Sequence, residues 1–194
     1  MPDRLRQERT FMKKIYLFLA DGFEEIEGLA VVDLCRRAKL ECITVSITDN
    51  TEITGSHGIR LYADRTFADG SLDDADMLVL PGGMPGTKHL LAHEGLKELL
   101  CRYAANQKYL AAICAAPSVL GNHGLLQGKK ATCFPGFEEK LLGATALDAP
   151  VVIDGNIITS RGFGTAIDFG LAIVETLLDT PTAAELAATI QYKK

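Results

Sequence analysis

The sequence lacks an excess of positive charge and any hydrophobic run long enough to cross a bilayer. Its 20 Lys and Arg are outnumbered by 25 Asp and Glu, which gives a formal net charge of −5. An acidic chain without a basic patch is a poor partner for nucleic acid or anionic lipid. The uncharged stretch 109–121 is too short to span a membrane, and Pro117 interrupts it. We therefore expect neither a nucleic-acid partner nor a membrane partner.

Paired cysteine motifs and targeting segments are lacking as well. The five cysteines include no Cys-x-x-Cys pair, which disfavours a disulfide scaffold or a zinc ribbon and favours a reduced, cytoplasmic protein. Residues 1–11 alternate in charge and resemble neither a secretory signal nor an anchor. We predict that residues 1–12 form a flexible arm, with Met1 or Met12 as the true start, and that residues 13–194 form one domain.

What the sequence does contain is a regular alternation of apolar runs and amphipathic stretches. Hydrophobic residues make up 47% of the 194 residues, enough for a sizeable core. Continuous apolar runs at 14–20, 75–81 and 109–113 are typical of parallel strands covered on both faces, and helical patterns separate them. This order, without repeats or a low-complexity linker, predicts an α/β domain with a mostly parallel sheet.

Two local patterns refine this prediction. Residues 51–54 and 59–62, with glycines between them, suggest a hairpin appended to the sheet. Asp21 and Glu24 have the Asp-x-x-Glu spacing of a capping box, which predicts the start of a helix that runs to about Lys39.

Cys114 is the first chemical candidate, because it follows the strand 109–113 and precedes a helix that admits Pro117 in its first turn. Ala112 and Ala116, two residues before and after it, are small, as a sharp turn that exposes a nucleophile requires. The positive end of the helix is expected to lower the pKa of the thiol. We interpret Cys114 as a nucleophile; the alternative is a buried structural cysteine.

A glycine pair follows the strand that ends at Pro81. Gly82 and Gly83 allow backbone N–H groups to turn toward a bound oxyanion, although such a pair alone usually marks a turn. Because Cys114 follows a neighbouring strand, we interpret Gly82 and Gly83 as half of an oxyanion hole. The N–H of Ala115 would form the other half.

Glu27 is the candidate acid. It shares a helical face with Ala30, Val31 and Leu34, so it points toward apolar surroundings. A carboxyl group there would become protonated beside a thiolate and donate a hydrogen bond to the sulfur; a solvated edge position is the alternative. No histidine adjoins Cys114 or follows it in a His-x-Asp or His-x-Glu pair, and none has the spacing of a metal ligand. We therefore expect acid–base chemistry by a carboxyl group, without a metal.

Four separated motifs resemble those of the ThiJ/PfpI superfamily, most closely the branch of the parkinsonism-associated protein deglycase and its bacterial relatives. They are Ala20-x-Gly22-x-Glu24-Glu25-x-Glu27, Leu80-Pro81-Gly82-Gly83, Ala112-Ile113-Cys114-Ala115-Ala116-Pro117 and Ser160-Arg161-Gly162-x-Gly164-Thr165. The resemblance covers about residues 13–192. It implies a flavodoxin-like three-layer sandwich with a mostly parallel central sheet, a homodimer, and no cofactor.

The resemblance also implies roles for single residues. Cys114 matches the reactive cysteine, and Glu27 matches the acid that hydrogen-bonds it. Gly83 and Ala115 match the backbone donors of the anion site, and Ile26 matches a position at the dimer interface.

Three positions depart from the family pattern. Phe134 stands where some relatives have a histidine near the reactive cysteine, so a histidine-assisted proton relay is absent. His57 replaces a pocket arginine, which weakens anion binding above the pKa of the imidazole. In the loop Arg161-Gly162-Phe163-Gly164, Phe163 makes one pocket wall aromatic. These departures bear on the choice of substrate.

The function implied is that of a cofactor-free, cysteine-dependent glyoxalase or protein deglycase. Its substrate would be a small 2-oxoaldehyde or the adduct of such an aldehyde on protein. The alternative is an oxidative-stress sensor or chaperone, in which the same cysteine is oxidised to sulfinic acid with little catalysis. A peptidase or glutaminase ranks third, because no histidine lies beside or after Cys114. The older family name attaches some members to thiazole monophosphate biosynthesis.

Overall fold

A central sheet of seven strands organises the chain in a computed structural model that describes residues 12–193. The strand order is β10-β11-β7-β6-β1-β2-β5, and every neighbouring pair is parallel except β10 with β11. The strands are β1 (Lys14–Leu19), β2 (Glu41–Ser46), β5 (Arg65–Thr66), β6 (Met77–Leu80), β7 (Tyr109–Ile113), β10 (Val151–Asp154) and β11 (Ile157–Ser160). The order from β2 to β11 is that of flavodoxin-like proteins, so the predicted fold class is confirmed.

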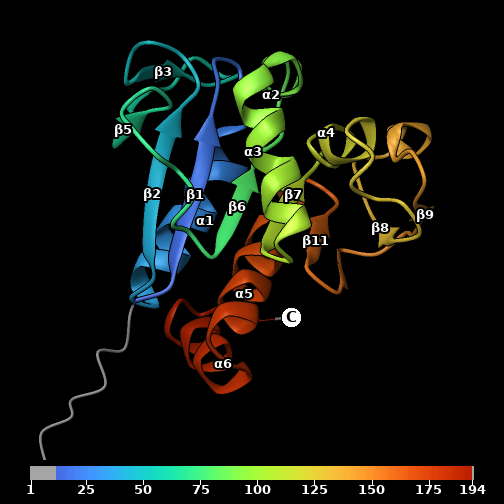
Figure 1. The fold of residues 1–194 in the computed structure, drawn as a ribbon. Coiled ribbons are helices and arrows are strands. Elements are labelled where there is room, and N and C mark those ends of the chain that lie inside the picture. Colours follow the sequence, from blue (N-terminus) through green and yellow to red (C-terminus); the bar gives the residue numbers. More distant parts are fainter. Residues whose placement is uncertain (1–11, 194) are drawn as a thin grey trace, which may run out of the picture.

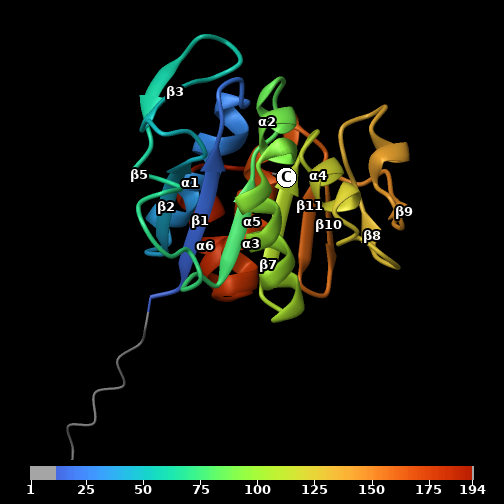
Figure 2. The ribbon, with the colours of Figure 1, turned by 45° about the horizontal axis from the view of Figure 1, so that its top comes forward.

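Helices cover both faces of this sheet (Figure 1). Figure 2 shows α3 in front of the sheet and α5 and α6 behind it. One layer contains α1 (Glu25–Arg37), α5 (Ala166–Leu177) and α6 (Thr180–Thr189), and the other contains α2 (Gly86–Ala92), α3 (Glu94–Ala105) and α4 (Pro117–Asn122). The three layers place the carboxyl ends of β1, β6 and β7 next to one another, where ligands bind in such folds.

The central strand β1 illustrates why two cores form. Ile15, Leu17 and Leu19 pack with the layer of α1 and α5, whereas Tyr16 and Phe18 pack with the layer of α3. All five side chains are at most 2% exposed. The side chains of a strand point alternately to its two faces, so a continuous apolar run produces a strand covered on both faces.

Two small sheets flank the central one and lie at opposite sides of the molecule (Figure 1). The first, β3 (Glu52–Thr54) with β4 (Arg60–Tyr62), is antiparallel and confirms the predicted hairpin. The second pairs β8 (Lys130–Ala131) with β9 (Thr145–Ala146) in parallel. Two short 3-10 helices, η1 (Glu138–Lys140) and η2 (Phe163–Thr165), complete the elements.

The predicted capping box at the start of α1 is wrong. Glu24 is the N-cap residue and makes no side-chain capping hydrogen bond. Asp21 Oδ1 instead accepts a hydrogen bond of 2.8 Å from the backbone N–H of Thr54, and thereby ties the loop after β1 to the hairpin. The helix ends at Arg37 rather than near Lys39, which adopts the left-handed conformation (φ 62°).

Two sequence predictions concern the ends of the chain and membrane contact. The predicted arm falls on residues 1–12, of which only Met12 belongs to the described part, where its side chain is exposed. Among the helices of residues 12–193, none combines the length and the apolar character that crossing a membrane requires.

Candidate active site

Cys114 occupies a sharp turn between β7 and α4. Its φ of +63° lies in the left-handed region that residues other than glycine rarely adopt. The backbone N–H of Cys114 donates to the Ser160 carbonyl at 2.9 Å, and its carbonyl accepts from the N–H of Phe134 at 2.8 Å. These bonds hold the turn from both sides. With α4 beginning at Pro117, the strand, turn and helix around the cysteine follow the predicted order.

Glu27 is buried beside this turn, with 1% of its surface exposed. Its Oε2 accepts a hydrogen bond of 2.9 Å from the backbone N–H of Gly82. Its Oε1 is also buried and has no hydrogen-bond partner of standard geometry among the described residues. A Cβ atom placed on Gly162 would lie 3.9 Å from this oxygen and 3.8 Å from the sulfur of Cys114. Of the two alternatives for Glu27, the buried position is therefore the observed one.

The absence of a side chain at Gly82 makes the close approach of Cys114 and Glu27 possible. A Cβ atom on Gly82 would lie 2.6 Å from the Cβ of Cys114 and 2.6 Å from Oε2 of Glu27. Real Cβ atoms essentially never make such contacts. Glycine at this position therefore lets the loop after β6 pass between the side chains of Cys114 and Glu27.

The two residues predicted for the oxyanion hole both lie at the sulfur. The backbone groups of Gly83 and Ala115 form hydrogen bonds with the Cys114 side chain, and these bonds favour its charged form. Gly83 has a φ of +91°, and a Cβ atom there would collide with the backbone of Phe23 and Glu24. The loop after β6 can therefore reach the sulfur only with glycine at this position.

Burial dominates the protonation of the Cys114–Glu27 pair. It raises the pKa of Glu27 to about 7, and hydrogen bonds from the Cys114 side chain and the Gly82 backbone oppose this shift only in part. Burial, and next the negative charge of Glu27, raise the pKa of Cys114 to about 12, against the smaller effects of Ala115 and Gly83. The prediction that the helix start makes this thiol acidic is therefore wrong while Glu27 is ionised.

Two acids in such contact titrate as a pair, not as separate groups. Between about pH 7 and pH 12 the pair of Glu27 and Cys114 holds a single proton. One tautomer has a thiol beside a carboxylate, and the other has a thiolate beside a carboxylic acid. Moving the proton onto Glu27 thus produces a Cys114 thiolate without any change in the net charge of the site.

His57 is engaged by carboxylates. Its Nδ1 lies 3.0 Å from Glu25 Oε2 and 3.5 Å from Glu24 Oε2, and the hydrogen bond to Glu25 raises the pKa of His57. Although burial opposes the shift, hydrogen bonds from His57 and from backbone groups lower the pKa of Glu25 to about 2. The ligand atoms of the three side chains lie within 4.8 Å of one another. They form the only cluster in residues 12–193 that could hold a metal ion, and the hydrogen bond between His57 and Glu25 accounts for the approach of these two side chains.

The remaining predicted pocket residues lie on the loop after β11, and Ile26, predicted for a dimer interface, lies in the first turn of α1. The Arg161 guanidinium forms an ion pair of 3.0 Å with Asp148. Phe163 and Ile26 are 58% and 45% exposed. Both contribute to a cavity of about 440 Å³ whose lining residues are Glu24, Glu25, Ile26, His57, Ile59 and Phe163. A place for Ile26 at a dimer interface stays a prediction.

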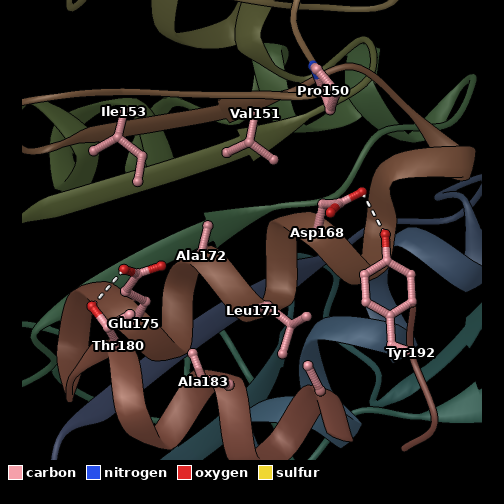
Figure 3. Close-up of a pocket in the computed structure, with 12 residues that line it drawn as sticks. Pro150, Val151, Ile153, Asp168, Leu171, Ala172, Glu175, Thr180, Ala183 and Tyr192 are labelled. Atoms are coloured by element: carbon pink, nitrogen blue, oxygen red, sulfur yellow. Dashed lines mark hydrogen bonds between the residues drawn. The ribbon is translucent and has the colours of Figure 1, made fainter. Parts of the chain in front are cut away.

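A larger cavity, of about 660 Å³, lies between β10, α5 and α6 (Figure 3). Hydrogen bonds of 2.8 Å join Tyr192 to Asp168 and Thr180 to Glu175 at its margin. None of the predicted site residues lines it. Sequence reasoning missed this cavity because it did not predict α6, which supplies one wall.

The fold and the turn define a flavodoxin-like α/β protein with a cysteine at the carboxyl end of a central strand. The chain belongs to the DJ-1/PfpI family, which it matches over residues 13–176. It is 40% identical over 163 residues to protein DJ-1 homolog B of Arabidopsis thaliana, and the match covers 84% of this chain and 37% of that relative. The predicted superfamily is thus confirmed.

Solved structures agree with this assignment. A DJ-1 superfamily protein of Salmonella typhimurium superimposes with a TM-score of 0.91 at 34% identity, covering 94% of this chain and 100% of that one. DJ-1 of Toxoplasma gondii, described as oxidized, superimposes with a TM-score of 0.90 at 33% identity and the same coverage.

Proposed function

We propose that this protein is a cofactor-free, cysteine-dependent glyoxalase or protein deglycase that acts on 2-oxoaldehydes or on their adducts with protein. The observation that carries this proposal is the pairing of Cys114, in a strained turn, with the buried Glu27, whose pKa is raised to about 7. A carboxyl group that titrates near neutral pH can both donate and accept a proton. A thiolate is the nucleophile that attacks carbonyl carbon.

In the first step, the proton of the pair resides on Glu27 and the charge on Cys114. The sulfur adds to the aldehyde carbon, the C=O π bond breaks, and the oxygen takes the proton from Glu27, which gives a hemithioacetal. The N–H groups of Gly83 and Ala115, which approach the sulfur, would stabilise negative charge on that oxygen during the addition.

In the second step, the Glu27 carboxylate removes the proton from the former aldehyde carbon and returns it to the adjacent carbonyl carbon. The hydroxyl proton on the first carbon passes to the oxygen of the second, so that a C=O bond forms at the first carbon as the C=O bond of the second becomes C–OH. The product is the thioester of a 2-hydroxy acid. Water then cleaves the C–S bond, releases the acid and restores the Cys114 thiol. One substrate carbon is oxidised and its neighbour is reduced, so the sequence needs no external oxidant or reductant.

The direct test is lactate formation from methylglyoxal by protein freed of metal ions. Cys114→Ser is expected to lower kcat/KM about 100-fold or more. Cys101→Ser is the matched control, because Cys101 is an exposed cysteine on α3, and it should retain full activity. Full turnover by Cys114→Ser would overturn the proposal.

A second candidate is an oxidative-stress sensor or chaperone with little catalysis. It is favoured by the Toxoplasma gondii DJ-1 structure, which is described as oxidized. In this chain, a protonated Glu27 could donate a hydrogen bond to an oxidised Cys114. Intact mass after mild peroxide, with turnover measured on the same sample, separates the two functions. A gain of two oxygens confined to Cys114, with negligible turnover, would favour the sensor.

We also propose that the protein is a cytoplasmic homodimer with Ile26 at the interface. Five free cysteines suit a reducing compartment. Ile26, Ile59 and Phe163 are large apolar side chains that are all at least 45% exposed, and they line one cavity. Ile26→Glu is expected to shift the protein toward the monomer in sedimentation experiments, whereas a monomeric wild type would contradict the proposal.

A further inference from the structure

The ring of Phe134 lies beside the candidate nucleophile. A Cβ atom placed on Gly162 would lie 3.3 Å from Cδ2 of this ring, 3.8 Å from the Cys114 sulfur and 3.9 Å from Oε1 of Glu27. The ring, the sulfur and the acid therefore converge on one small space. Because residue 162 is glycine, no side chain fills that space.

The backbone of Phe134 is held in place while its ring stays accessible. Its N–H donates to the Cys114 carbonyl at 2.8 Å, and its carbonyl accepts from the N–H of Phe137 at 3.0 Å. The preceding Cys133 is buried, whereas Phe134 is 47% exposed. A single exposed aromatic ring is ordinary on a protein surface. The ring of Phe134 differs because it also lies next to the sulfur of Cys114. A substituent of a substrate bound at the sulfur can pack against the ring.

The charges of the predicted pocket residues favour a neutral substituent. His57 is hydrogen-bonded to Glu25, and Arg161 is paired with Asp148. The two predicted pocket cations are thus each engaged by a carboxylate. Glu27 adds a further acid beside the sulfur, and an anionic substrate group would meet its charge above about pH 7.

We propose that Phe134 is a specificity-determining residue that selects 2-oxoaldehydes with a neutral aromatic substituent, such as phenylglyoxal, over small aliphatic ones. This inference rests on the proposed function for its substrate class. Contact between two aromatic rings, together with the apolar area that it buries, corresponds to a preference of about 10-fold.

The test uses probes that react without turnover. 2-Chloroacetophenone and chloroacetone are matched α-chloroketones that differ in a phenyl and a methyl group. In both reactions the Cys114 thiolate displaces chloride, so that an S–C bond forms and the C–Cl bond breaks. Rates are measured by peptide mass at Cys114 and, in the same molecules, at the exposed Cys101, which corrects for the intrinsic reactivity of the two reagents.

In the wild type, the phenyl-to-methyl rate ratio at Cys114 is expected to exceed that at Cys101 about 10-fold. Phe134→Ala should lower the ratio at Cys114 to that at Cys101. If the alanine variant unfolds, Phe134→Leu replaces it: this variant keeps an apolar side chain but lacks the ring, and it should lower the ratio at Cys114 in the same way. Tyr62→Ala is the control, since Tyr62 is an exposed aromatic residue at the end of β4 and does not line the cavity of Phe163; it should leave the ratio unchanged. A carboxylate on the ring of the probe should abolish the advantage.

Equal ratios at Cys114 and Cys101 in the wild type would overturn the inference. So would a ratio that Phe134→Ala leaves intact, or a Cys114 that neither reagent modifies while Cys101 is consumed. Turnover of phenylglyoxal and methylglyoxal is measured in parallel. A high phenyl-to-methyl ratio at Cys114 without turnover would support the aromatic subsite and reject the proposed reaction. Turnover with a ratio at Cys114 near that at Cys101 would support the reaction and reject the aromatic subsite.

Discussion

The backbone N–H of Gly82 donates a hydrogen bond of 2.9 Å to Oε2 of Glu27, although the two residues are 55 positions apart in the chain. This bond fixes one oxygen of the buried carboxyl group and leaves Oε1 to share with the Cys114 sulfur the space left by Gly162. The loop after β6 thus orients the Glu27 carboxyl group, and the turn after β7 orients the Cys114 thiol.

Substitution of Gly82 tests this close approach. Gly82→Ala would place a Cβ atom 2.6 Å from both the Cys114 Cβ and Glu27 Oε2. We expect the free energy of unfolding to fall by about 1–3 kcal/mol, together with a loss of turnover. Gly164→Ala is the control, because a Cβ atom there would meet nothing within 4 Å. Denaturant unfolding of both variants checks the prediction, and equal stability would contradict it.

The raised pKa of Glu27 predicts a particular dependence of stability on pH. Its folded value is about 7, against an ordinary value of 4.5. Between these values the folded state binds more protons than the unfolded state, so the free energy of unfolding should fall as the pH rises. The fall should amount to about 3 kcal/mol. Subtracting the profile of Glu27→Gln cancels the other titrating groups, and a flat difference between pH 4.5 and pH 7 would disprove the shift.

Gly162→Ala is predicted to slow the alkylation of Cys114 while changing the free energy of unfolding only slightly. Gly162 has extended backbone (φ 161°), so alanine introduces no backbone strain there, although its Cβ atom would lie 3.3 Å from Cδ2 of Phe134. The free energy of unfolding should fall by no more than about 1 kcal/mol, because the half-exposed ring of Phe134 can move away. The added methyl group would occupy the space shared by Phe134, Cys114 and Glu27, and alkylation of Cys114 by iodoacetamide should slow about 10-fold. An unchanged rate relative to Cys101 would show that reagents reach the sulfur by another path.

Local patterns sufficed to predict the fold and the position of Cys114 at the turn between a strand and a helix. The apolar run of β1 alternates between the two cores, and Cys114 follows β7 directly. The helix α6 was missed because its burial rests mainly on Ala183 and Leu186, which leave a weak apolar period. The capping prediction at Asp21 failed because Thr54 of the hairpin binds that side chain.

The chemistry of the site was less accessible from sequence. The partners that hold the strained turn, Ser160 and Phe134, are distant in the chain, and no local signal marks such pairs. The pKa of Cys114 was predicted in the wrong direction because burial and the Glu27 charge outweigh the backbone hydrogen bonds. Burial depends on how several elements pack around one atom, which a strand-and-helix pattern does not specify.

The central claim is that Glu27 carries the proton of Cys114, and Glu27→Gln tests it most directly. The substitution removes the charge that helps to raise the pKa of Cys114 to about 12, so that pKa should fall in the variant. Loss of the transferable proton should at the same time lower turnover about 100-fold or more.

The decisive measurement is thiolate absorbance against pH for wild type and Glu27→Gln, with Cys114→Ser subtracted to remove the other cysteines and the tyrosines. Turnover is recorded on the same samples. The account predicts a lower Cys114 pKa, a larger thiolate fraction at pH 8 and far slower turnover in Glu27→Gln. An unchanged titration curve, or turnover that survives the substitution, would contradict it.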